Sequence, residues 1–180
     1  MAAALLIFWC VDKRQGYYVF LVGALGTVCN QFLKLAFRIP RPWVLDPDFQ
    51  IIEAARADAT GYSFPSGHTQ NIVGTTASIF ASRKEAWVRI VCVVLMLLLP
   101  FSRMYLGVHT PLDVGVAFLT ALALAAALYP AFRTESAAKK TVPWLLLGVA
   151  VLCGGYLIYA SSLARCDWPA GSEDLSNITH

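Results

Sequence analysis

Several stretches of this chain contain enough consecutive apolar residues to cross a lipid bilayer. A helix needs about 20 mostly apolar residues to span the roughly 30 Å hydrocarbon core, and residues 17–37 meet that requirement. Hydrophobic residues make up 58% of the chain and charged residues only 14%, whereas soluble domains carry about 25% charged residues. The chain therefore has too little charge to cover a water-facing surface. This composition excludes a disordered chain, a soluble nucleic-acid-binding protein and a disulfide-stapled secreted domain.

Five segments have the apolarity expected of membrane spans: residues 17–37, 67–82, 87–101, 110–129 and 143–163. The second is shorter and unusually polar, so we expect it to face the interior of a helix bundle, because polar groups facing lipid have no hydrogen-bond partner. Residues 1–11 are apolar but cover only about half a bilayer as a helix. They are either the end of a helix whose beginning is missing or an interfacial segment.

The predicted fold is an all-α polytopic transmembrane bundle. It has five full spans and the short N-terminal apolar segment, and it forms one membrane-embedded domain over residues 1–163. A polar tail follows over residues 164–180. The five cysteines are odd in number and lie mostly in apolar runs, so no disulfide framework is readable.

The basic residues predict the orientation in the membrane. Alternating spans place the connections at 12–16, 83–86 and 130–142 on one side, and these carry more than half of the 14 lysines and arginines: Lys13, Arg14, Arg83, Lys84, Arg89 just beyond, Arg133, Lys139 and Lys140. The positive-inside rule assigns this side to the cytoplasm. The long connection over residues 38–66 then lies outside, and its aromatic residues suit the membrane interface. The net charge of +3 is too small to indicate a polyanionic partner such as nucleic acid.

Residues that can bind an anion and transfer protons gather at the predicted outer ends of the spans. They form three groups along the chain: Lys34 with Arg41-Pro42, then Pro65-Ser66-Gly67-His68, then Ser102-Arg103 with His109 and Asp113. Ser66 is expected to cap a helix whose free backbone N–H groups attract anions, and Gly67 lets the backbone approach a ligand closely. Arginine's planar fork suits phosphate oxygens. Two histidines can divide the roles of nucleophile and general acid.

Simpler interpretations exist for individual residues. A single lysine at the end of a span, such as Lys34, is most often an anchor that extends to the interface. The sequence around Ser66 is also an ordinary helix start, and Thr110-Pro111-Leu112-Asp113 resembles a capping box with proline at its first helical position. Two histidines near one membrane face are harder to explain structurally, because ionisable groups there are generally functional. The combination therefore favours a site.

These three groups, with their spacing and order, resemble the signature of the type 2 phosphatidic acid phosphatase superfamily. The resemblance covers residues 17–129 and implies a bundle of six helices with the site at the outer surface. By this resemblance, the first family helix is expected to be missing from this chain and the second to be shortened to residues 1–11. The family also contains vanadium-dependent haloperoxidases, so a haloperoxidase-like enzyme is an alternative in the same pocket.

The resemblance also implies residue roles. His109 is the expected nucleophile that forms a phosphohistidine, His68 the general acid and base, and Asp113 the group that orients His109. The phosphoryl oxygens are expected to bind five residues: Lys34, Arg41, Ser66, Gly67 and Arg103. No metal ion or other cofactor is implied, because the cations do the work of Mg²⁺. Vanadate, a mimic of the phosphoryl transition state, should inhibit.

The expected activity is therefore hydrolysis of a lipid phosphate or diphosphate at the extracytoplasmic face of a membrane, with a bacterial cell membrane as the expected location. The family substrates are undecaprenyl diphosphate, phosphatidylglycerol phosphate and phosphatidic acid, of which the polyprenyl diphosphate ranks slightly first. The alternative from another class is a non-catalytic membrane bundle that binds or transports an anion.

Overall fold

The computed structural model describes residues 2–46, 48–56, 59 and 61–164, and within these ranges it contains helices and no strands. The helices are α1 Ala2–Cys10, α2 Lys13–Phe37, α3 Pro42–Leu45, α4 Gly67–Ser82, α5 Ala86–Tyr105, α6 Pro111–Leu128 and α7 Glu135–Ala164, with 3₁₀ turns η1 Glu53–Ala55 and η2 Tyr129–Phe132. The predicted all-α fold is confirmed. The predicted polar tail lies outside the described residues beyond Ala164.

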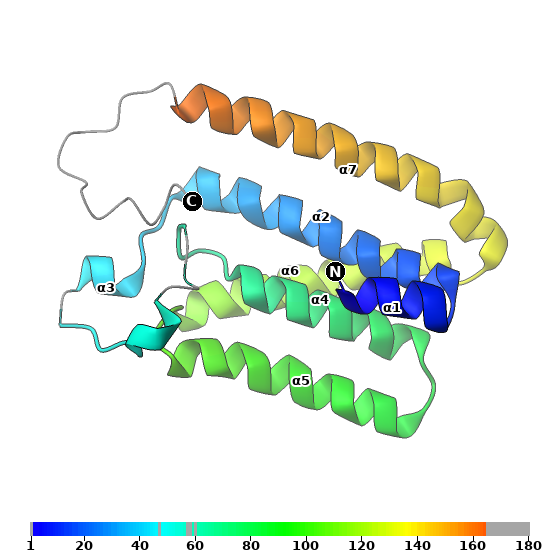
Figure 1. Ribbon diagram of the computed structural model, residues 1–180, viewed down its shortest axis with the longest axis horizontal. Coiled ribbons are helices and arrows are strands. Elements are labelled where there is room, and N and C mark those ends of the chain that lie inside the picture. Colours follow the sequence, from blue (N-terminus) through cyan, green and yellow to red (C-terminus); the bar gives the residue numbers. More distant parts are fainter. Residues whose placement is uncertain (1, 47, 57–58, 60, 165–180) are drawn as a thin grey trace.

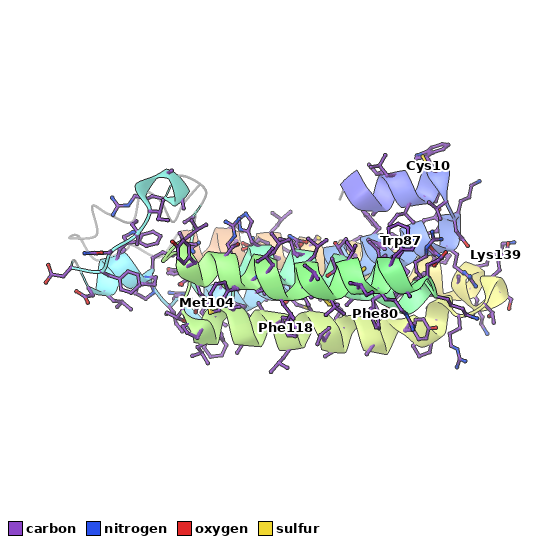
Figure 2. All side chains as sticks on the ribbon, turned by 90° about the horizontal axis from the view of Figure 1, so that it is seen from below. Cys10, Phe80, Trp87, Met104, Phe118 and Lys139 are labelled. Atoms are coloured by element: carbon purple, nitrogen blue, oxygen red, sulfur yellow. The ribbon has the colours of Figure 1, made fainter. Side chains whose placement is uncertain are left out.

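The long helices lie side by side, and each runs antiparallel to the next along the chain (Figure 1). The end of α2 and the starts of α4 and α6 therefore meet at one end of the bundle, close to α3 and η1. The α4–α5 and α6–α7 connections lie at the other end. In the view of Figure 2, Met104 lies toward the first end and Lys139 at the second. The three basic connections predicted to share a side do so.

Four helical segments are long and apolar enough to cross a membrane: Lys13–Leu45, Ala86–Tyr105, Pro111–Phe132 and Glu135–Ser162. They overlap four of the five predicted spans, and the chain is a multi-pass membrane protein. The fifth prediction corresponds to α4, which has 16 residues and would be about 24 Å long. It contacts α2, α5 and α6, and Thr69, Gln70 and Ser78 are buried. The expectation that this polar helix faces the interior is confirmed.

Small residues allow α6 to pack closely into the bundle. Ala117, Ala121 and Ala125 follow one another at intervals of four, so they share one helix face, and all three are buried. Small residues at such positions let helix backbones approach in a membrane. The hydroxyl of Tyr18 in α2 donates a hydrogen bond of 2.7 Å to the carbonyl of Ala125. The two helices are thereby joined by both packing and a buried polar contact.

The N-terminal segment folds back along the first turns of α2. The apolar N-terminal segment is helical over Ala2–Cys10. A Cβ atom on Gly16 would lie 2.5 Å from the Cβ of Phe8, so the close approach of α1 to α2 requires glycine there. Phe8 also meets the ring of Tyr17 edge to face, with the centroids 5.1 Å apart.

Candidate functional site

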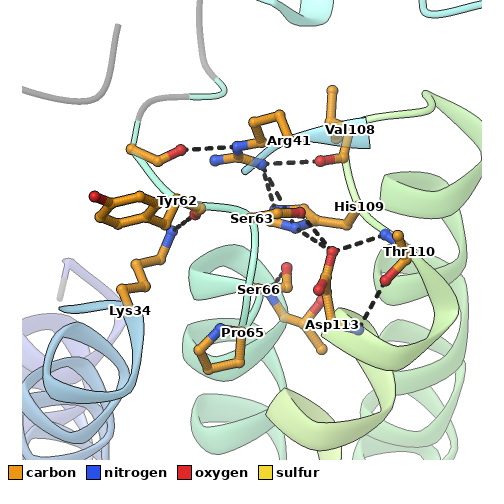
Figure 3. A network of polar contacts seen from close by, with 12 residues as sticks. Lys34, Arg41, Tyr62, Ser63, Pro65, Ser66, Val108, His109, Thr110 and Asp113 are labelled. Carbon is orange, nitrogen blue, oxygen red and sulfur yellow. Dashed lines mark hydrogen bonds and ion pairs between the residues drawn. The ribbon is translucent and has the colours of Figure 1, made fainter. Parts of the chain in front are cut away.

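Backbone hydrogen bonds join the three motif-bearing segments at one end of the bundle. The amide of Ser63 donates to the carbonyl of Ile39 at 2.9 Å, which links the segment before α4 to the segment after α2. The amide of Ser66 donates to the carbonyl of Asp113 at 3.1 Å, which links the starts of α4 and α6. These bonds bring residues more than 40 positions apart in the chain into one cluster, shown in Figure 3.

The start of α4 is formed as the sequence predicts. The hydroxyl of Ser66 accepts a hydrogen bond from the amide of Thr69 at 3.4 Å, so Ser66 is the N-cap. Ser66 is fully buried, and the side chain of Asn30 in α2 donates to the carbonyl of Pro65 at 3.3 Å. A Cβ atom on Gly67 would lie no closer than 3.6 Å to Asn30. Packing within the described protein therefore leaves room at Gly67 and does not itself demand glycine.

The start of α6 forms the capping box that its sequence resembles. The amide of Asp113 donates to the hydroxyl of Thr110 at 3.2 Å, and the amide of Thr110 donates to Oδ2 of Asp113 at 2.8 Å. The same Oδ2 lies 3.6 Å from Nδ1 of His109 and accepts a hydrogen bond from the hydroxyl of Ser63. Asp113 therefore caps a helix and also faces His109. One role does not exclude the other.

Arg41 holds the opposite side of the His109 ring (Figure 3). Its Nη1 lies 3.1 Å from Nε2 and 3.5 Å from Nδ1. These similar distances place the guanidinium against the ring, away from the line of either nitrogen's lone pair. Arg41 is 6% exposed and donates to the carbonyls of Gly61 at 3.0 Å and Val108 at 2.9 Å. Backbone carbonyls thus hold the guanidinium in place.

His109 is neutral at physiological pH. The residue is 5% exposed, and burial lowers the pKa of its imidazole to about 4, because burial disfavours the charged form; the Asp113 carboxylate opposes this effect and Arg41 and Lys34 add to it. A carboxylate accepts hydrogen bonds, so we assign the ring proton to Nδ1, facing Asp113. Nε2 then carries the lone pair, as a nucleophile requires.

The three remaining predicted residues lie at the same end of the bundle as this cluster. The ammonium of Lys34 donates to the carbonyl of Tyr62, so Lys34 is held against the same connection as Arg41. His68 is in the first turn of α4 and its side chain is exposed. Arg103 is in the last turn of α5, and its Nε is buried without a hydrogen-bond partner among the described residues.

A short turn brings His109 back toward the bundle after α5. Gly107 in this turn has a φ of +74°, a left-handed conformation that costs other residues about 1–2 kcal/mol. A Cβ atom there would also lie 2.9 Å from the carbonyl oxygen of Gln50. Glycine is therefore required two residues before His109.

Sequence reasoning missed Ser63 and Asn30. Ser63 precedes the recognised motif by two residues and is 1% exposed, and nothing in its local sequence indicates contact with a residue 50 positions away. Asn30 lies within the apolar span predicted over residues 17–37. A polar residue in such a span, one turn before Lys34, is the signal that would have identified it. Among the described residues, no group of three or more His, Cys, Asp or Glu residues is placed to hold a metal ion.

Comparison with known proteins gives matches to one family. The sequence model of the PAP2 superfamily matches residues 15–137. Undecaprenyl-diphosphatase BcrC of Bacillus subtilis (strain 168) is 36% identical over 118 residues, which cover 63% of this chain and 58% of that protein. An undecaprenyl-diphosphatase of Sulfolobus acidocaldarius is 29% identical over 116 residues, which cover 64% of this chain and 54% of that protein. The chain thus spans little more than half the length of these relatives. No solved structure matches it.

Proposed function

This chain belongs to the PAP2 superfamily, and from that premise we propose that it is a membrane phosphatase that hydrolyses a lipid diphosphate. The observation that carries the proposal is the placement of a buried, neutral His109 between the carboxylate of Asp113 and the guanidinium of Arg41. A neutral imidazole is the nucleophilic form, and the cation beside it can bind the anionic group that is attacked. Undecaprenyl diphosphate is the first candidate substrate, because both relatives are named for it.

In the proposed reaction, Nε2 of His109 attacks the terminal phosphorus. An N–P bond forms while the bond from phosphorus to the leaving oxygen breaks, and the bonding electrons go to that oxygen. The histidine gains positive charge in this step, which the carboxylate of Asp113 offsets. Water then attacks the phosphohistidine and releases inorganic phosphate.

His68 is proposed to move the protons. As an acid it protonates the leaving phosphate of the lipid, and as a base it then takes a proton from the attacking water. Its exposure at the first turn of α4 suits a residue that must reach both the leaving group and water. This role is a proposal that rests on the family motif and on that exposure.

The phosphoryl oxygens are proposed to bind Lys34, Arg41, Arg103 and the backbone around Ser66 and Gly67. Buried N–H groups are rarely left without a partner in native structures, and the Nε of Arg103 is such a group among the described residues. A phosphate oxygen would satisfy it. The first free amides of α4 add a partial positive charge at the same place, so that charge developing in the transition state is offset by fixed groups.

The substrate is proposed to reach the site from the bilayer. The cluster lies at the ends of membrane-spanning helices, where the phosphate of a lipid would be at headgroup depth. We propose that this is the extracytoplasmic face, because the opposite end carries most of the basic residues. Phosphatidylglycerol phosphate and phosphatidic acid also carry a terminal phosphoryl group, but it is esterified to an alcohol, so an alcohol would leave in place of a phosphate; they are the other candidates.

The decisive experiment uses His109→Ala with lipid diphosphate labelled at its terminal phosphorus. Wild-type protein should release labelled phosphate and yield an acid-labile phosphoprotein when quenched early. His109→Ala should do neither while still binding the lipid, and the surface control Lys84→Gln should behave as wild type. If His109→Ala retains turnover, His109 is not the nucleophile. If wild-type protein binds the lipid without releasing phosphate, the chain is an anion-binding bundle and not an enzyme.

A further inference from the structure

A second site lies at the end of the bundle opposite His109. A cavity of about 680 Å³ lies between the first turns of α2 and of α7 and is lined by both helices. This volume is within the range of about 300–1,000 Å³ that ligand pockets occupy. The cluster around His109 contributes no lining residue. We propose that this cavity binds the phosphate of an anionic phospholipid, with a fatty-acyl chain against its apolar wall.

The charges lining the cavity leave a net positive charge. Lys139 pairs with Glu135 at 2.7 Å, and Arg14 lies 3.9 Å from Asp12. Lys13 is exposed and makes no hydrogen bond or ion pair with the described residues. After both pairs are counted, the charge of Lys13 remains, and it matches a lipid whose headgroup carries one net negative charge.

The two pairs do not prevent an anion from binding. The Lys139–Glu135 pair is about three-quarters exposed on both side chains, and exposed pairs contribute only about 0–1 kcal/mol. Lys139 can therefore exchange its carboxylate for a phosphate at little cost. Arg14 also donates to the carbonyl of Arg133 at 2.8 Å, which holds the guanidinium in place while its other N–H groups stay available.

The helix ends themselves are not the anion site. The side chain of Asp12 accepts from the amides of Arg14 and Gln15 at the start of α2, and the hydroxyl of Thr134 accepts from the amide of Ala137 at the start of α7. Recognition must therefore come from side chains. The other side chains that line the cavity are apolar or aromatic: Tyr17, Ala138, Val142 and Pro143. A lining that combines charged with apolar side chains fits an amphiphile better than a free anion.

The position of the cavity gives such a lipid a structural role. In its most apolar window, α7 is only 6% buried, and its main helix partner is α2. A lipid between the first turns of these helices would contact both. A ligand that binds only the folded protein raises its unfolding temperature, and basic pockets between transmembrane helices on the cytoplasmic side bind anionic headgroups.

The test measures thermal unfolding of the full chain in dodecyl maltoside micelles during titration with dioleoylphosphatidylglycerol, dioleoylphosphatidylcholine or inorganic phosphate. Phosphatidylglycerol should raise the unfolding temperature in a saturable manner, whereas the other two should not. Lys13→Gln and Lys139→Gln should each weaken the apparent affinity for phosphatidylglycerol by about fivefold. The matched control Lys84→Gln removes a cation at the same end of the bundle and outside the cavity, so its affinity should stay within twofold of wild type.

Each contrary result overturns the proposal in a distinct way. Equal effects of the two lipids would show that the headgroup charge is not recognised. An equal effect of inorganic phosphate would identify an anion site without a lipid preference. Equal losses in Lys13→Gln and Lys84→Gln would indicate a general surface-charge effect. Because lipid binding is measured without turnover, these outcomes are independent of whether the chain is a phosphatase.

Discussion

Replacement of Asp113 by Asn separates the charge of this residue from its shape. The amide of Thr110, the hydroxyl of Ser63 and Nδ1 of His109 all face the same oxygen, Oδ2. An asparagine whose carbonyl oxygen takes that place keeps all three contacts. Asp113→Asn should therefore retain the capping box and lose only the negative charge next to His109.

The magnitude follows from the 3.6 Å separation between Oδ2 and Nδ1. Two unit charges at that distance attract each other by roughly 4.6 kcal/mol at an effective dielectric constant of about 20. If this contact shortens to hydrogen-bond length in the transition state, a hydrogen bond to a charged group, counted net of water, contributes about 1.5–3 kcal/mol. Since each 1.36 kcal/mol is about tenfold in rate, we expect kcat to fall between about 10-fold and 2,000-fold. The free energy of unfolding should fall by only about 0.3–1 kcal/mol, the usual contribution of a charge at a helix N-terminus.

The assay pairs phosphate release from undecaprenyl diphosphate with thermal unfolding of the same purified sample. Asp46→Asn is the matched control, because it removes an exposed carboxylate from the segment after α2 and should change neither quantity. A kcat for Asp113→Asn within threefold of wild type, at an unchanged unfolding temperature, would refute the electrostatic role. A large loss of stability would instead show that the charge matters mainly for folding.

Two further predictions concern protonation and packing. The folded protein holds the pKa of His109 at about 4, below its ordinary 6.5. The decrease of kcat/KM on the acid side of the pH profile, which reports the free enzyme, should therefore have its midpoint near pH 4. A midpoint near pH 6.5 would contradict the buried neutral ring. Between pH 6.5 and 4 the unfolded chain binds a proton at His109 and the folded chain does not. The contribution of His109 to the free energy of unfolding should therefore fall as pH decreases through that window and be constant above it. Chemical denaturation measures this free energy. Gly26→Ala places a Cβ atom 2.9 Å from Nε2 of Gln70. The side chain of Gln70 is held in place because its Oε1 accepts a hydrogen bond from Thr120 at 2.7 Å. The substitution should therefore lower the free energy of unfolding by about 1–3 kcal/mol. The control Gly148→Ala has no atom within 4 Å and should raise it by up to about 1 kcal/mol; equal shifts in both variants would show that Gly26 is not a packing position.

Local rules predicted the parts of the fold that depend on neighbours in the sequence. The apolar runs gave the spans, and the N-caps at Ser66 and Thr110 depend on groups within three residues. Residues 67–82 are predicted as a full membrane span, yet α4 has only 16 residues. Its polar residues are accommodated because α2, α5 and α6 surround it, so it does not need to match the bilayer thickness.

The parts that sequence did not predict depend on long-range contacts. The position of Ser63 against Asp113 follows from the backbone bond between Ser66 and Asp113, which closes only once α4 and α6 are side by side. Arg41 likewise meets His109 across 68 residues. The family motif indicates that these residues act together, but the partner carbonyls of Gly61, Tyr62 and Val108 have no side-chain signature.

The direct backbone bond between the starts of α4 and α6 divides the site into two parts that are held by different contacts. His109, Asp113 and the Ser66 cap belong to that joined pair of helix starts, whereas Lys34 and Arg41 are secured to the carbonyls of residues 61 and 62. A shift of the connection at residues 61 and 62 is therefore expected to move these two cations relative to His109, while the bond between Ser66 and Asp113 keeps the two helix starts in register.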